Sequence, residues 1–198
     1  MAEDQVADFE VEEIEGAEGP PPLDPEVAER RRVALQQVRQ YGDPVLRTKA
    51  RPVDAFDEAL RAEVARMGAL MIDSLGIGLA ATQVGVPHRL LVYRVEQGAP
   101  VNALVNPAIE FSSDEEEWAE EGCLSLPAVH VEVERPVFVR VRAKDENGDH
   151  VVVEASGLEA RVIQHEVDHL DGVLILDRTP KDQRKEAMRA MREALDAA

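Results

Sequence analysis

The stretch Gln164-His165-Glu166-Val167-Asp168-His169 places two imidazoles four residues apart, with a carboxylate directly after the first. In an α-helix, residues i and i+4 share a face, so His165 and His169 would hold one metal ion between them. Glu166 would then reach a water molecule on that ion. The pattern predicts a metallohydrolase helix, although pairs of this kind also occur on protein surfaces without a metal.

The residues that follow narrow the choice among metal enzymes. One extended zinc-protease motif has Gly three residues after the second His and a third His three residues further on. Gly172 fits this motif, but Ile175 stands where the third His would be. The site therefore needs a third ligand from elsewhere, with a fourth position left for water. In a generic zinc endopeptidase Asp171 or Asp177 would be that ligand, but the lone cysteine would then be unexplained.

The single cysteine, Cys123, lies in Glu120-Glu121-Gly122-Cys123-Leu124-Ser125-Leu126-Pro127. A lone cysteine is more often a small buried hydrophobic residue than a ligand. Here Gly122 lets the backbone approach a ligand closely, and Pro127 favours a turn that would hold a thiolate at the end of an extended segment. The other histidines are expected to be solvated or packing residues: His88, His130 and His150.

A third segment is Gly76-Ile77-Gly78-Leu79-Ala80-Ala81-Thr82-Gln83-Val84-Gly85. The Gly-x-Gly-x-x-Gly spacing of a nucleotide-binding loop fails at Ala81, and no Lys follows as in a phosphate-binding loop. Small residues followed by one amide indicate backbone crowded against a ligand, with Gln83 as a neutral hydrogen-bond donor. A packed turn would explain the segment equally well.

Taken together, segments 76–83, 121–125 and 164–169 resemble peptide deformylase, the family that removes the formyl group from nascent chains. The resemblance runs from about Val33 to about Met191 and begins with Tyr41-Gly42-Asp43-Pro44-Val45-Leu46-Arg47. It implies that three residues bind the metal and one is the general acid/base. These are Cys123, His165 and His169 as ligands, and Glu166 for proton transfer.

The same resemblance implies further roles. The Gln83 side chain and the backbone N–H of Leu124 would bind the formyl oxygen as negative charge builds on it. Backbone around Gly78 and Gly122 would align the peptide. The pocket for the methionine side chain would consist of apolar residues that are equally compatible with ordinary core packing: Ile77, Leu124, Leu158 and Val162.

His130 and Arg135 are expected to lie around the metal ligands rather than to bind the metal. Several family members carry Arg where this chain has His130, which puts a polar contact to the downstream peptide in doubt. Arg135 does match the family, and the resemblance implies that it pairs with Asp168 behind the metal and orients the helix. The alternative is a surface salt bridge with little effect on stability.

The donor set and the resemblance favour different metals. One thiolate, two imidazoles and a water would satisfy Zn²⁺, and the affinity order alone favours zinc over ferrous iron. Resemblance to bacterial deformylases instead implies Fe²⁺. We expect one divalent ion, with Fe²⁺ as the active metal and Zn²⁺, Ni²⁺ or Co²⁺ able to substitute for it.

The net charge of −18 is unevenly distributed along the 198 residues. Residues 1–29 contain eleven acidic and no basic residues, and they include Pro20-Pro21-Pro22. This composition predicts a disordered acidic leader before a catalytic domain over residues 30–198. The leader lacks the basic start and apolar stretch of a secretory signal, and no run approaches the roughly 18 apolar residues of a membrane span. We therefore expect a cytoplasmic protein.

The sequence predicts an α+β fold, with mixed small antiparallel sheets packed around the metal-bearing helix and a C-terminal helix. Helical periodicity or capping signals mark three segments, with Asp54 or Asp57 as the cap of the first: 57–73, 158–170 and 182–195. Alternating or apolar runs mark three strands, and Asn147-Gly148 supplies a turn between the last two: 89–95, 137–143 and 151–154.

These observations predict a monomeric metal-dependent deformylase that acts on N-formylmethionyl peptides. The alternative is a catalytically silent relative that binds ribosomes or formylated peptides. The last helix carries basic residues suited to transient docking on the ribosome, but interleaved acids favour a solvated amphipathic helix. We expect no specific recognition of nucleic acid.

Overall fold

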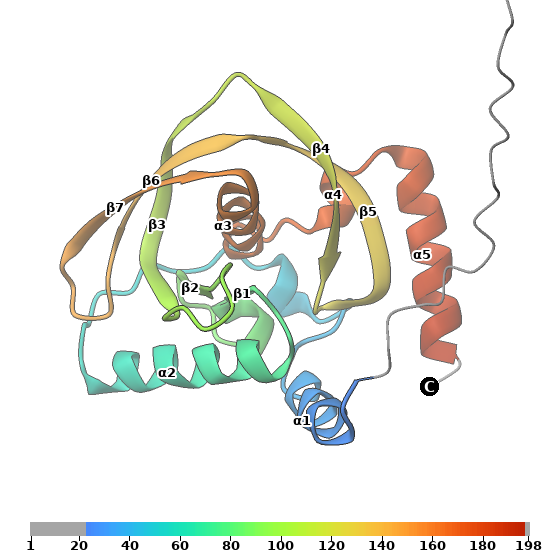
Figure 1. The fold of residues 1–198 in the computed structure, drawn as a ribbon, viewed down its shortest axis with the longest axis horizontal. Helices are drawn as coiled ribbons and strands as arrows, with labels where there is room; N and C mark the ends of the chain where they lie inside the picture. The colour runs from blue at the N-terminus through green and yellow to red at the C-terminus, as the bar shows by residue number, and fades with distance from the viewer. Residues whose placement is uncertain (1–22, 197–198) are drawn as a thin grey trace, which may run out of the picture.

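Two antiparallel sheets curve around one central helix in the computed structural model, which describes residues 23–196 (Figure 1). The larger sheet has the strand order β1-β2-β3-β6-β7. Its strands are β1 (Gly78–Ala80), β2 (Leu90–Tyr93), β3 (Asn102–Ser112), β6 (Phe138–Lys144) and β7 (His150–Ser156). The smaller sheet pairs β4 (Glu116–Cys123) with β5 (Leu126–Pro136). The predicted α+β class is confirmed.

The central helix is α3 (Gly157–Leu170), and nine of its fourteen residues are buried. A helix buried on most of its surface must be enclosed by other elements, and α3 packs on strands of both sheets. Asp171 caps its C-terminus, and Gly172 follows with a φ of 74°, the left-handed conformation common after helix C-termini. A Cβ at Gly172 would lie 2.7 Å from the Arg47 carbonyl oxygen. Gly172 therefore ends the helix.

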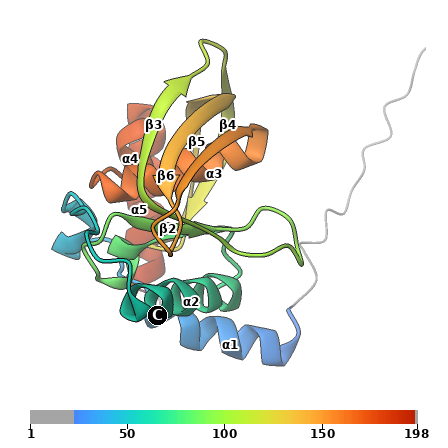
Figure 2. The same cartoon turned by 90° about the vertical axis from the view of Figure 1, so that its left-hand side faces the viewer.

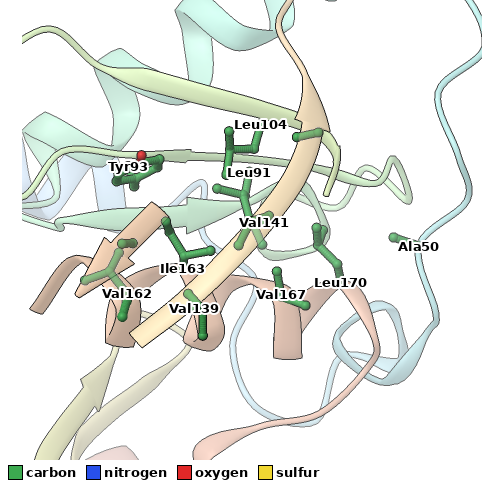
Figure 3. Close-up of a cluster of buried hydrophobic side chains, with 14 residues drawn as sticks. Ala50, Leu91, Tyr93, Leu104, Val139, Val141, Val162, Ile163, Val167 and Leu170 are labelled. Carbon is green, nitrogen blue, oxygen red and sulfur yellow. The ribbon is translucent and has the colours of Figure 1, made fainter. Parts of the chain in front are cut away.

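Three buried clusters hold these layers together. Figure 3 shows the first, in which residues of α3 meet the larger sheet: Ile163, Val167 and Leu170 with Leu91, Leu104, Val139 and Val141. The second lies between that sheet and α2 (Glu58–Asp73), around Met67 and Met71. The third joins β5 to α4 (Ile175–Arg178) and α5 (Lys181–Asp196). In Figure 1, α5 lies outside β5.

The predicted helices and strands are present with small shifts at their ends. Asp57 caps α2, because its Oδ1 accepts a hydrogen bond from the Leu60 N–H at 3.1 Å. Strands β2, β6 and β7 and helix α5 match the expected segments. Strands β1, β3, β4 and β5 fall outside the three predicted strand segments. In β3, the register with β6 shifts between Val105 and Ala108, and Asn106 has a φ of 55°. None of the described helices combines the length and apolarity needed to cross a membrane.

The expected boundary of the leader is wrong for residues 25–29, which are helical. Helix α1 spans Pro25–Leu35, and the Asp24 carboxylate accepts a hydrogen bond from the Glu26 N–H at 2.9 Å. Asp as cap with Pro in the first turn is a strong start signal. Ala34, 3% exposed, fixes the other end of α1 in the core, and α1 contacts α2 (Figure 2). The rest of the leader, residues 1–22, lies outside the described residues.

We expect Ile163→Ala to lower the free energy of unfolding by about 2–5 kcal/mol, because the side chain is fully buried between α3 and the larger sheet. Val152→Ala is the control: Val152 on β7 is 60% exposed, and its truncation should cost less than about 0.5 kcal/mol. Urea unfolding of both variants at equal metal loading measures the difference. Equal losses would contradict the assignment of Ile163 to the core.

Candidate active site

Two elements bring together three side chains that could hold a metal ion. Cys123 ends strand β4, and His165 and His169 lie one helical turn apart on α3. The Cys123 Sγ lies 3.3 Å from the His169 Nε2, and the two Nε2 atoms lie 3.2 Å apart. All three donor atoms lie within 4.8 Å of one another. The structure thus joins the residues that the sequence analysis named as ligands.

This donor set fits a divalent metal ion. Ligand distances of about 2.0–2.3 Å in a tetrahedron put neighbouring donor atoms roughly 3.3–3.6 Å apart. The distances from the His169 Nε2 to the other two donor atoms, 3.3 and 3.2 Å, are close to this range. Burial lowers the pKa of His169 well below its usual value, which favours the neutral imidazole that a metal ligand needs. One thiol and two imidazoles are ligands suited to zinc and other first-row transition metals.

A buried carboxylate, Glu121, fixes the orientation of His165. Its Oε2 lies 2.9 Å from the His165 Nδ1, which turns the Nε2 toward the other donors. Its two oxygens also accept hydrogen bonds from Arg135 at 2.6 and 2.9 Å, and Oε1 accepts one from Arg161 at 2.9 Å. Burial alone would raise the pKa of Glu121, but the hydrogen bonds from His165 and Arg135 lower it to about 2.

Glu121 had no predicted role, although its sequence position carries a signal. Alternate residues of a strand share a face, so Glu121 and Cys123 of β4 point to the same side. On α3, Arg161 and His165 are four residues apart and also share a face. Glu121 therefore lies two residues before Cys123 on the same face of β4. Arg161 lies four residues before His165 on the same face of α3.

The expected pair of Arg135 and Asp168 is present and buried. Arg135 is 4% exposed, and its Nη1 donates to the Asp168 Oδ2 at 2.9 Å. Arg178 donates to both oxygens of the same carboxylate, at 3.1 and 2.6 Å. The alternative of a surface salt bridge is therefore wrong. The pair links β5 to the helix that carries both histidines.

Gln83 points its amide nitrogen at the metal-binding group. It lies in a short 3₁₀ helix, η2 (Ala81–Val84), directly after β1. Its Oε1 accepts a hydrogen bond from the Ala80 N–H at 2.9 Å, which orients the amide. Its Nε2 then lies 3.7 Å from the Cys123 Sγ and 3.2 Å from the Ser125 Oγ. The segment is thus more than a packed turn.

Glu166 occupies a tight position beside β1. A Cβ added to Gly78 would collide with the Glu166 carboxylate, so this close approach requires glycine. The Glu166 Oε2 is buried and has no hydrogen-bond partner among the described residues. Burial raises the pKa of Glu166 to about 7, against the opposing charge of His165. Such a carboxyl group can gain and lose a proton near neutral pH.

A cavity of about 390 Å³ opens over these groups. Its walls include every residue that the sequence analysis assigned to the peptide or to its methionine side chain: Ile77, Gly78, Gly122, Leu124, Leu158 and Val162. Ile77 and Leu158 are 43% and 55% exposed, which is unlike ordinary core residues. His130 also lines the cavity, whereas the buried His169 lies behind its wall.

The other candidate ligands have different partners. Asp171 accepts a hydrogen bond from Arg89 at 2.8 Å, and Asp177 forms an ion pair with Arg47. Neither belongs to the Cys123 group. His88 lies 2.9 Å from a Glu63 oxygen. The endopeptidase interpretation, with a downstream carboxylate as third ligand, therefore disagrees with the structure.

Residues 35–185 match the family model described as polypeptide deformylase. The chain belongs to this family. A peptide deformylase of Acidothermus cellulolyticus is 46% identical over 162 residues, which cover 82% of this chain and 88% of the relative. One from Thermotoga neapolitana is 51% identical over 144 residues, which cover 73% of this chain and 87% of the relative.

A solved structure supports the same relationship. The peptide deformylase of Synechococcus elongatus in complex with actinonin superposes with a TM-score of 0.75 at 43% identity. The match covers 79% of this chain and 86% of that one. Helix α1 mostly precedes residue 35, where the family match begins.

We expect Glu121→Gln to weaken metal binding by about 10- to 100-fold, because the residue orients His165 and the amide would leave Arg135 without one of its charge partners. The free energy of unfolding should fall by about 3–5 kcal/mol, as for other broken buried ion pairs. Competition with a chelator and urea unfolding measure the two effects.

The control is Glu120→Gln. The Glu120 side chain is 69% exposed, and its ion-pair partner, His130 at 3.6 Å, is exposed as well. We expect unchanged metal affinity and unchanged stability for this variant. If both substitutions behave alike, the Glu121 network does not support the metal-binding group.

Proposed function

We propose that this chain hydrolyses the N-formyl group of N-formylmethionyl peptides and releases formate. The observation that carries the proposal is one cavity lined by two ligand-type residues, a buried acid and an aligned amide: Cys123, His165, Glu166 and Gln83. The third ligand type, His169, lies behind the same wall. Membership of the polypeptide deformylase family supports this reaction.

Cys123, His165 and His169 would hold one divalent metal ion, which lowers the pKa of a bound water toward ~7. Glu166 accepts the proton of the attacking water at its unpartnered Oε2 and later donates it to the leaving amine. Its raised pKa, about 7, suits both steps. Gly78 leaves the space that the carboxylate needs beside the reacting group.

Gln83 and Leu124 would stabilise the charge that develops on the formyl oxygen. The amide of Gln83 is held by the Ala80 N–H, so little reorganisation is needed when charge appears. The backbone N–H of Leu124 follows the Cys123 ligand directly and would be the second donor. Two fixed donors on one oxygen are the usual means of lowering the barrier to acyl transfer.

The methionine side chain would enter the apolar part of the cavity, against Ile77, Leu124, Leu158 and Val162. The peptide backbone would run between Gly78 and Gly122, where the absence of side chains permits close approach. Burial of a methionine side chain contributes about 1.5–3 kcal/mol. This contribution would select the first residue of the substrate.

We also propose that the protein works as a monomer on nascent chains in the cytoplasm, where a lone thiolate stays reduced. Docking on the ribosome would be transient. On α5, Arg189 lies 3.6 Å from Glu193, and Arg184 lies 3.8 Å from Asp177 of α4. Cations that already face carboxylates attract a polyanion less strongly.

Glu166→Ala tests the proposed reaction. We expect about one metal per chain to remain, because Glu166 is not a ligand, while formate release from a formylmethionyl peptide falls on the order of 10²-fold or more. Glu159→Ala, on the same helix and hydrogen-bonded to Tyr93, should retain activity. An active Glu166→Ala enzyme, or wild-type protein that cuts internal peptide bonds instead, would refute the proposal.

For the metal, we propose Fe²⁺ as the active ion. Cys123 is partly exposed in the cavity, so air or peroxide should inactivate the enzyme by oxidising the iron or the thiolate. The apo-protein is loaded anaerobically with Fe²⁺, Co²⁺, Ni²⁺ or Zn²⁺, and formate release is measured before and after exposure to air. We expect the iron form to be faster than the zinc form and to be lost in air. Equal and air-stable activities would rule out the iron assignment.

A further inference from the structure

Helix α1 brings a charged residue into the catalytic cavity from outside the family domain. The family match begins at residue 35, whereas Arg31 of α1 lines the cavity together with Leu35. In Figure 1, α1 lies at one end of α2, below the tip of β4 where Cys123 is found. The α1–α2 contact agrees with this placement.

The residues one helical turn after Arg31 show which face of α1 it lies on. Arg31, Ala34 and Leu35 share a helical face, because they are spaced by three and four residues. Ala34 is 3% exposed, and Leu35 packs with the same buried cluster as Leu124 of the cavity wall. The face that carries Arg31 thus begins at the body of the protein, and Arg31, an exposed residue, lines the cavity from there.

The two arginines that line the cavity differ in their partners. Arg161 is engaged, since it donates to a Glu121 oxygen at 2.9 Å and to two backbone carbonyls at 2.8 and 2.7 Å. Arg31 makes no side-chain hydrogen bond or ion pair with any residue in the range 23–196. Among the described residues, therefore, no carboxylate neutralises the charge of Arg31.

A second hollow, of about 420 Å³, continues past this edge and shares Leu75, Gly76 and Ile77 with the cavity. Arg30 and Arg94 line it, together with Asp73. Neither arginine has an ion pair with a described residue. Beyond the methionine pocket, this side of the cleft therefore carries three arginines without an ion-pair partner among the described residues, against the carboxylate of Asp73. The exposed Glu120, which also lines the first cavity, lies 3.6 Å from His130.

We propose that Arg31 binds a carboxylate on the formylated peptide within the three residues after methionine, so that acidic peptides are preferred. The proposal rests on the proposed deformylation. Because Arg31 is exposed at the rim, the attraction is modest and screened by salt. It should act mainly on KM, since the contact is remote from the formyl group and equal in the bound and transition states.

The test uses formylmethionyl tetrapeptide amides with one Asp at the second, third or fourth position, each compared with its Asn counterpart. Amidation removes the terminal carboxylate. For the full chain loaded with metal, we expect kcat/KM to be roughly threefold higher for Asp at one position or more, through a lower KM. About 1 M salt should abolish the preference.

Three variants separate charge recognition from a structural effect of α1. Arg31→Ala should bring the Asp/Asn ratio of kcat/KM to about one. Arg31→Glu should reverse the preference, so that a peptide with Lys at the same position is favoured over the Asp peptide. Arg32→Ala is the matched control: Arg32 is the next residue, pairs with Glu29 at 2.6 Å and does not line the cavity, so the preference should persist.

Each outcome bears on the inference. A wild-type ratio near one at all three positions, or a preference that survives in Arg31→Glu, would overturn it while deformylation stands. Equal losses on Asp and Asn peptides in Arg31→Ala would show that α1 only shapes the cavity, and would also overturn it. If the wild-type protein releases no formate from any peptide, the proposed function fails, and this inference fails with it.

Discussion

The carboxylate of Glu121 joins three elements at the centre of the molecule. From β4 it reaches Arg135 on β5 and both Arg161 and His165 on α3, all within 2.6–2.9 Å. Such a buried charge is tolerated only when hydrogen bonds and opposite charges surround it, as here. The same contacts that hold the smaller sheet against α3 also fix the tautomer and orientation of His165. The fold and the arrangement of Cys123, His165 and His169 therefore depend on one network.

The three candidate metal ligands come from two different elements, and the same network accounts for this. The i, i+4 spacing of α3 supplies two imidazoles on one face, but a third donor at the same point must come from another segment. Strand β4 runs past α3 and ends there, which brings Cys123 within 3.3 Å of His169. Because Glu121 lies two residues before Cys123, tying down the carboxylate also sets the position of the thiol.

Local sequence signals were enough to predict two of the main helices and most residues of the candidate site. Helix periodicity gave α2 and α3, and the resemblance at three motifs brought Cys123 and Gln83 to the same site. Features that depend on contacts between distant residues were not predicted. The role of Glu121 depends on contacts with residues 14 to 44 positions away, which no local pattern contains. Strand β3 escaped because Asn106 interrupts its alternation, and α1 because acidic composition outweighed the Asp24-Pro25 start signal.

Glu121 and Glu166 show how one site gives two carboxylates opposite tasks. Both carboxyl groups are buried near His165. Burial alone would raise the pKa of each. Hydrogen bonds from His165 and Arg135 lower the pKa of Glu121 to about 2, so it stays charged. Glu166 has one oxygen without a partner, so burial prevails and its pKa rises to about 7. Hydrogen-bond partners, more than burial, thus separate the structural carboxylate from the one able to transfer a proton.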